Sequence, residues 1–235
     1  MEGKMADVIE FQESTPSLES YWRSIILFGR NVASYKFALA QSLLDLADAG
    51  KTAVTLGELA DPYAKHLCEH LKTAPKQATS RSSSFLEACQ DYNQGKIDHN
   101  RLIAVTEQKG FNNVIDAFHV VNEGPIPIKF YEKDYSRDSK RIVLTDDVFR
   151  LREIPFSDNL FAESEARWNL VEKAWELNLS RSLLTVRYDE TDQKFVADAD
   201  ESLRRKDITS ARGALNGYQK GKCFYCYHPT GSIKR

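Results

Sequence analysis

The strongest structural signal in the chain is the run VASYKFALAQSLLDLADAG, residues 32–50. Its apolar residues recur at helical spacing and occupy nearly every side of the predicted helix. A helix that is apolar all round must be buried, so this segment is predicted to be the central helix of the fold. Gly50 is expected to end it, because glycine readily adopts the left-handed conformation that follows many helices.

Further helix signals lie on both sides of this segment. Ser17 is expected to cap a helix that reaches Phe28. Thr55 and Glu58 form a capping box ahead of a helix that ends near Lys72. Other helices are predicted at 85–92, 100–108, 112–121 and 158–179, with Asp98 capping the second of them and a short helix beginning at Thr145.

Two β-hairpins are predicted among the helices. Residues 126–131 and 141–144 are β-prone runs around a charged turn, and Pro125 and Pro127 limit the first run to an edge strand. The runs 184–188 and 194–197 alternate in the same way. The expected class is therefore mainly α with small β-hairpins (α+β). The expected domains are a helical domain at 1–180, a hairpin connector at 181–210 and a separate module at 211–235.

Composition favours a soluble intracellular protein. Of the 235 residues, 42% are hydrophobic, which is enough to bury a core. Charges interrupt the apolar stretches, and residues 1–15 lack the apolar core of a secretion signal, so no membrane association is indicated and a cytoplasmic location is expected. Cys68 and Cys89 lie far from the close pair Cys223 and Cys226, so the four cysteines form no disulfide framework.

The net charge of −2 conceals an uneven distribution. Residues 201–235 carry +6, which leaves −8 on residues 1–200. A basic end of this kind is suited to nucleic-acid phosphates, because lysine and arginine release counterions when they bind them; a solvated tail is the alternative. The residues predicted to contact nucleic acid, with DNA as the expected partner, are Arg204, Arg205, Lys206, Arg212, Lys220 and Lys222.

The one passage that indicates a specific chemistry is Cys223-Phe-Tyr-Cys226. A Cys-x-x-Cys pair places two thiolates on one tight turn, as in half of a tetrahedral zinc site. Two ligands leave two coordination positions open, which a second chain could fill. A pair of reduced thiols or a redox pair is the alternative, although residues 229–232 give no helix of the kind a thioredoxin-like site requires.

The lead-in to this pair resembles the opening of an HNH endonuclease module of the four-cysteine type. Gln219, Gly221, Cys223 and Cys226 match its Gln-x-Gly-x-Cys-x-x-Cys pattern. Three further segments are similar to the amino-terminal regions of bacterial proteins that carry such a nuclease: YWRSIILFG at 21–29, YKFAL at 35–39 and PIPIKFY at 125–131.

The resemblance implies the amino-terminal portion of an HNH-type DNA endonuclease, with a helical accessory domain and the start of a ββα-metal module. In that family an Asp-His strand and a second cysteine pair follow, together with one catalytic divalent metal. Here the sequence stops at Arg235, and His228 follows Tyr227 rather than an aspartate. The resemblance therefore implies a structural zinc half-site at Cys223 and Cys226, no catalytic residue and no activity for this chain alone.

Other candidate sites in the sequence are weaker. His66 and His70 share one face of a predicted helix and could bind a metal, but no third ligand is evident and a polar exposed surface is the simpler interpretation. Trp22, Trp168 and Trp175 lie on apolar faces and are predicted to belong to the core.

A non-enzymatic alternative remains open from the sequence. The chain contains neither a phosphate-binding loop of the type G-x-x-x-x-G-K-[ST] nor a serine elbow G-x-S-x-G. It could instead be a helical interaction or nucleic-acid-binding module that pairs with itself or with a full-length relative.

Overall fold

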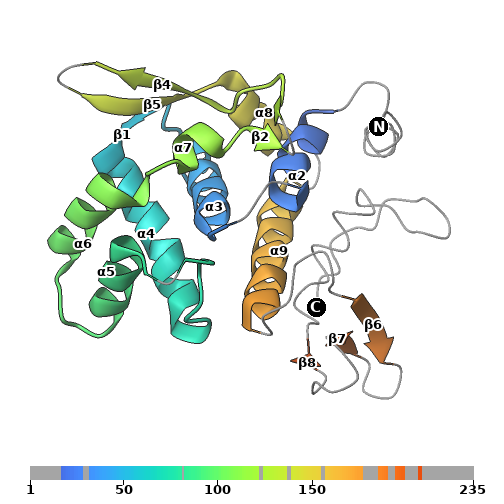
Figure 1. Cartoon of the computed structure of the whole chain (residues 1–235). Coiled ribbons are helices and arrows are strands. Elements are labelled where there is room, and N and C mark those ends of the chain that lie inside the picture. Colours follow the sequence, from blue (N-terminus) through green and yellow to red (C-terminus); the bar gives the residue numbers. More distant parts are fainter. Residues whose placement is uncertain are drawn as a thin grey trace.

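The computed structural model describes residues 17–28, 32–80, 82–121, 124–136, 139–154 and 157–176, and the backbone of residues 185–189, 194–198 and 206–207. The described architecture is mostly helical with small antiparallel sheets, which confirms the α+β class (Figure 1). Its helices are α2 (Leu18–Phe28), α3 (Tyr35–Asp48), α4 (Leu56–Thr73), α5 (Ser84–Asn93), α6 (His99–Val105), α7 (Val114–Ala117), α8 (Asp146–Glu153) and α9 (Asp158–Glu176), with a π-helix, η1, at Thr106–Gly110.

Helix α3 is the central helix, as predicted. Figure 1 shows it between the group α4 to α6 and the pair α2 and α9, and it contacts α2, α4, α7, α8 and α9. Even its polar residues Lys36, Gln41 and Ser42 are buried. Gly50 adopts a φ of +68° just after the helix, so the predicted helix end is confirmed.

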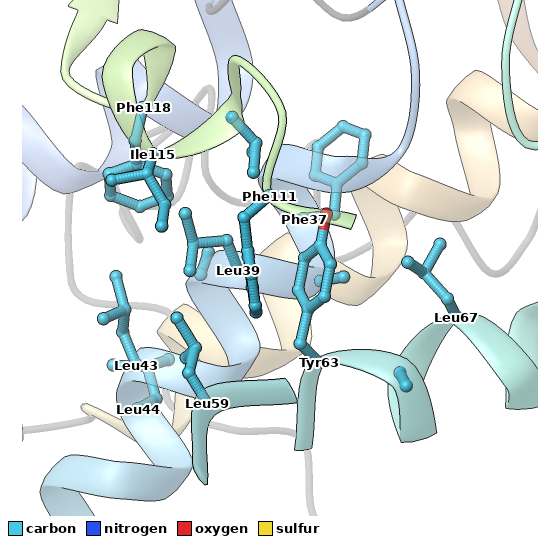
Figure 2. Packing of buried hydrophobic residues seen from close by; sticks show 14 of the residues in the cluster. Phe37, Leu39, Leu43, Leu44, Leu59, Tyr63, Leu67, Phe111, Ile115 and Phe118 are labelled. Carbon is cyan, nitrogen blue, oxygen red and sulfur yellow. The ribbon is translucent and has the colours of Figure 1, made fainter. Parts of the chain in front are cut away.

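The core forms where α3 meets α4. Figure 2 shows Leu43 and Leu44 of α3 beside Leu59 and Tyr63 of α4, with Phe111 packed above them. The capping box predicted for α4 is present, because Thr55 accepts a hydrogen bond from the Glu58 amide and Glu58 accepts one from the Thr55 amide. This local signal therefore fixes the start of the helix that covers α3.

A small sheet covers one end of the helices. It consists of β1 (Ala53–Thr55), β5 (Lys140–Leu144) and β4 (Tyr131–Tyr135), in that order and all antiparallel. Val54 of β1 lies opposite Ile142 of β5, and both are buried. The sheet thus turns one apolar face toward the core and leaves a charged face in solvent.

The second run of the first predicted hairpin, 141–144, lies within β5, but the first run was misplaced. The run 126–131 is not a strand, apart from Tyr131 at its end and the pairing of Pro125 in the short β3 (Gly124–Pro125) with β2 (Val120–Val121). Proline cannot donate to a ladder, and Phe130 packs edge-on against Trp22 instead. The strand lies in the segment that was expected to be a charged turn, where Arg141 donates a 2.6 Å bond to Asp134 across the ladder.

The helices predicted at 100–108 and 112–121 were also misjudged. The first is α6 followed by η1, and its cap by Asp98 is confirmed by a 2.7 Å bond from the Arg101 amide. The second is shortened to α7, and Asn113, with a φ of +68°, accounts for its later start at Val114. Gly110 allows this close packing, since a Cβ there would lie 3.1 Å from Phe85 Cε1.

Of two further predicted helix caps, one is confirmed and the other is not. Ser17 caps α2 through a 3.3 Å bond from the Ser20 amide, as expected. Thr145 precedes α8 as predicted, but its hydroxyl donates to the Lys129 carbonyl at 2.6 Å and makes no capping bond. The competing acceptor lies in the loop before β4, which the sequence pattern does not reveal.

Three further predictions about the chain are confirmed. Trp22, Trp168 and Trp175 are buried, and Cys68 and Cys89 are buried free thiols. The connector hairpin is present as β6 (Thr185–Asp189) and β7 (Lys194–Asp198), with β8 (Lys206–Asp207) added to β7. Across the described part of the chain, no helix combines the length and apolar character needed to cross a membrane.

Truncation of a central side chain should expose how much the fold depends on α3. Leu43→Ala is expected to lower the free energy of unfolding by about 2–5 kcal/mol, because Leu43 is fully buried and the cavity cannot be refilled by water. Urea denaturation followed by circular dichroism measures this loss. The control Lys65→Ala, on the exposed face of α4, should change stability by less than about 0.5 kcal/mol; equal effects of the two variants would contradict the central role of α3.

Candidate functional site

The residues that the sequence indicates for DNA and zinc lie mostly outside the described residues. This holds for Arg204, Arg205, Arg212, Lys220, Lys222, Cys223, Cys226 and His228. Lys206 is described only through its backbone, which pairs with Ala197 in the ladder of β7 and β8. The predicted DNA and zinc sites therefore remain predictions. The polar clusters and cavities of the described body are a separate source of candidate sites.

The structure separates the two histidines that the sequence placed on one face of α4. His66 Nε2 lies 2.7 Å from Asp45 Oδ2 of α3, whereas His70 is 7% exposed and faces α9. An exposed polar surface was therefore the wrong interpretation for His70. Within the described ranges, no group of three or more histidine, cysteine or acidic side chains is arranged to hold a metal ion.

His70 lies between two carboxylates of α9. Its Nδ1 is 2.7 Å from Glu172 Oε1 and its Nε2 is 3.1 Å from Glu165 Oε2. A neutral imidazole has one N–H, so it can donate to only one of two ionised carboxylates. The geometry therefore fits an imidazolium that donates to both.

A second layer of contacts fixes this histidine. Its ring stacks on the Trp168 indole with centroids 3.5 Å apart and planes within 4°. The Trp168 Nε1 donates a 2.9 Å bond to Gln77 Oε1, while Gln77 Nε2 donates to Glu172 Oε1 at 2.5 Å. Stacking on the indole face also favours the cationic form of the ring. Together these contacts tie α4, α9 and the segment after α4 into one polar network.

The pKa values agree with an ionised network. Burial alone would lower the pKa of His70, but the hydrogen bonds that its ring donates to Glu165 and Glu172, with the charges of these carboxylates, outweigh burial and raise the pKa from 6.5 to about 9. Burial would raise the pKa of Glu165, but its bonds with His70 and with Gln41 of α3 (2.8 Å) hold that pKa below its usual value. The network is thus a charged clamp between helices.

Described residues line at least two cavities on the body, and His70 lines neither of these two. The larger, of about 530 Å³, lies beside the π-helix and is lined by Arg101, Glu107, Gln108 and Lys140 together with apolar side chains. Interruptions of this helical type are frequent at functional sites. The smaller, of about 240 Å³, lies at the start of α3 and contains one charged group, Lys36.

Lys36 is a buried cation at the edge of the smaller cavity. Its Nζ donates a 2.8 Å bond to the Val120 carbonyl, and burial lowers its pKa to about 8. Nearby His119 accepts a 2.9 Å bond from the Phe130 amide. Burial lowers the pKa of His119 to about 4, with added repulsion from Lys129 and Lys36, so His119 is neutral near pH 7. Two cations, Lys36 and Lys129, therefore act on the His119 ring.

Comparisons with known proteins identify no relative. Searches of protein-family models, curated proteins and solved structures each found no match. The functional argument for this chain accordingly depends on its residues and their geometry.

The sequence of α9 contains a pattern that points to a buried partner for its acidic residues, although the apolar spacing used to predict the helix does not include it. Glu165, Trp168 and Glu172 are spaced three and four residues apart, so they occupy one face of α9. Two acids beside a core tryptophan require a buried basic partner. The identity of that partner follows only from the packing of α9 against α4, which brings His70 to the same place.

The clamp should make stability depend on pH in a defined direction. Because the pKa of His70 is raised on folding, its contribution is fully present below about pH 6.5 and is lost as the pH rises through about 9. A shift of this size corresponds to on the order of 3 kcal/mol. The free energy of unfolding of the wild-type protein, minus that of His70→Gln, should therefore shrink between these pH values.

The difference between the two proteins is the quantity to measure by urea denaturation. Lys36 has a lowered pKa and contributes with the opposite sign, but equally in both proteins. The matched variant His66→Gln removes a more exposed pair with Asp45 and should cost about 1 kcal/mol or less. Parallel curves for wild type and His70→Gln from pH 6.5 to 9 would show that His70 is not ionised in the clamp.

Proposed function

We propose that the chain is the nucleic-acid-binding, amino-terminal portion of an HNH-type DNA endonuclease. The observation that carries the proposal is the sequence Gln219-x-Gly221-x-Cys223-x-x-Cys226 inside a segment of net charge +6. Either feature alone is common. Here two lysines, Lys220 and Lys222, directly precede the cysteine pair, so a metal-ligand turn and phosphate-binding groups lie in one short segment. The combination favours DNA over an apolar protein partner.

The distribution of charge assigns binding to the end of the chain. Residues 1–200 carry −8, so most of the helical body repels a polyanion, whereas residues 201–235 attract it. The hairpin of β6 and β7, followed by β8, leads directly into this basic segment. In the proposal the helical domain supports the segment, and the start of a ββα-metal module follows at 211–235.

Binding without cleavage is the activity proposed for these residues. Hydrolysis by an HNH site requires a histidine that activates water beside a divalent metal held by acidic and imidazole ligands. The nine residues after Cys226 include His228 but no aspartate or glutamate. The 235 residues accordingly lack the group that would hold the catalytic metal in that position.

The two thiolates supply half of a structural zinc site in this proposal. Zinc in such sites is tetrahedral and takes four protein ligands. Cys223 and Cys226 supply two of them. Two copies of the chain would complete one site, which links zinc binding to pairing of the chains.

DNA binding should be electrostatic and should depend on the basic segment. Affinity of the 235-residue protein for a duplex oligonucleotide, measured by fluorescence anisotropy, is expected to fall steeply as salt is added. The double variant Lys220→Ala, Lys222→Ala should bind more weakly at every sequence and lower the log–log salt slope by roughly 2, one for each lost phosphate contact.

A matched variant and a cleavage assay test the same proposal from two further directions. Lys65→Ala combined with Lys96→Ala removes the same charge from exposed positions of the body and should leave the salt slope unchanged.

Plasmid DNA incubated with the protein and Mg²⁺ should remain intact. Salt-insensitive association with a protein partner would instead favour the helical interaction module, and nicking that His228→Ala abolishes would refute the inactive assignment.

Zinc content should report the half-site directly. The purified protein is expected to hold one zinc ion for every two chains, because each chain contributes two thiolates to four positions. Chelation should release the zinc and shift the protein from dimer to monomer in analytical ultracentrifugation. Cys223→Ser should abolish both properties, whereas Cys68→Ser, at a buried thiol of the body, should retain the zinc; zinc that survives Cys223→Ser would contradict the assignment.

A further inference from the structure

The smaller cavity of the body is built by three chain segments that are distant in sequence. It is lined by the start of α3 around Lys36, by residues 78–80 and by residues 112–114 with Ala117. A bridge between Ala33 and Ala78 holds the first two segments together. The cavity therefore exists only in the folded body and is independent of the basic segment at 201–235.

Lys36 is the unusual member of this lining. Its side chain is 6% exposed, and the Val120 carbonyl is its one hydrogen-bond acceptor within the described residues. An ammonium group can donate three hydrogen bonds. Among the described residues that line the cavity there is no aspartate or glutamate, so within this part of the chain the buried positive charge lacks the carboxylate that normally balances it.

A second lysine lies near the ring that Lys36 influences. Besides burial, both Lys129 and Lys36 lower the pKa of His119 by repelling its proton. The cavity also lies at the amino end of α3, a helix of 14 residues. The Ser34 hydroxyl, at the cap position, is bonded to Gln77 and makes no capping bond, so the positive end of the helix is left without a side-chain acceptor.

Neutral hydrogen-bonding groups complete the lining. Ser80, Asn112 and Asn113 bring a hydroxyl and two amides to the cavity, and their side chains have no hydrogen bond within the described part of the chain. Asn113 is held in a left-handed conformation, with a φ of +68°. Conformations of this kind often position groups at binding sites.

We propose that this cavity binds a phosphate group, with the Lys36 ammonium paired to the anion and the amides of Asn112 and Asn113 donating to its oxygens. A volume of about 240 Å³ suits a phosphate with at most a small attached group. A bound oxyanion would supply the counter-charge that Lys36 lacks. The phosphate can come from a small molecule or from a DNA backbone, and the site goes beyond the proposed role of the basic segment in either case.

The test is calorimetric titration of the full 235-residue protein with inorganic phosphate near neutral pH. Wild type is expected to bind, and Lys36→Met should weaken binding roughly ten- to hundredfold, because methionine retains the buried stem and removes the charge. Lys65→Met removes a lysine from the exposed face of α4 and should bind as wild type does. A second variant, Ala117→Leu, fills the cavity without altering Lys36 and should also abolish binding.

Sulfate allows the pH dependence of anion binding to be measured, because the charge of sulfate does not change near pH 8. Its affinity should fall as the pH rises through about 8, where Lys36 loses its proton. Of the other groups that face this corner, His119 is neutral across that range, Tyr35 has a raised pKa because of its burial, and Lys129 is exposed. The pH dependence should be absent in Lys36→Met.

The outcomes separate this site from the proposed DNA-binding segment. No binding of phosphate by wild type, or equal binding by wild type, Lys36→Met and Ala117→Leu, would overturn the site. If Lys36→Met loses phosphate but binds duplex DNA as wild type does, the cavity is a small-molecule phosphate site. If both are lost while the Lys220, Lys222 double variant retains phosphate, the cavity holds a phosphate of the DNA backbone.

Discussion

The burial of most of α3 is the constraint on which the rest of the structure depends. An isolated helix of 14 residues is only marginally stable, so α3 persists because other elements cover all of it except Asp45, Asp48 and part of Tyr35. The elements α2, α4, α7, α8 and α9 each supply an apolar face to it. The small sheet serves the same purpose at one end, where Val54 and Ile142 close the core. This requirement selects a helical body with minor β-structure.

Burial of most of α3 also buries three of its polar residues, Lys36, Gln41 and Ser42, which find different partners. Ser42 bonds to the Ala38 carbonyl within its own helix. Gln41 donates to Glu165 and so joins the ionised clamp around His70. Among the described residues, Lys36 has a single carbonyl acceptor and no carboxylate. The buried Gln41 Oε1 also has no hydrogen-bond partner among them, but only Lys36 carries a charge, which is why an anion is proposed for the cavity beside it.

The sequence predicted what is encoded within one or two helical turns. The capping box of Thr55 and Glu58, the cap at Asp98 and the glycine after α3 each act on adjacent residues, and all three are present. The distant segments with which each element pairs or packs could not be predicted from the sequence. Strand β1 exists only because it pairs with β5, and the clamp exists only because α9 packs on α4. A pattern in one segment gives no information on which distant segment completes it.

The two proposed phosphate-binding regions differ in how far their cationic groups are screened and desolvated. The basic segment at 201–235 concentrates eight cationic residues that a salt solution screens over roughly 8 Å, so its attraction is long in reach and sensitive to ionic strength. Lys36 is a single charge inside a cavity, where screening is weak and desolvation has already occurred on folding. An anion that enters the cavity therefore gains more from one lysine than it would at the surface. Attraction by the segment and capture by the cavity are consequently separable by salt, because only the first should weaken steeply as ions are added.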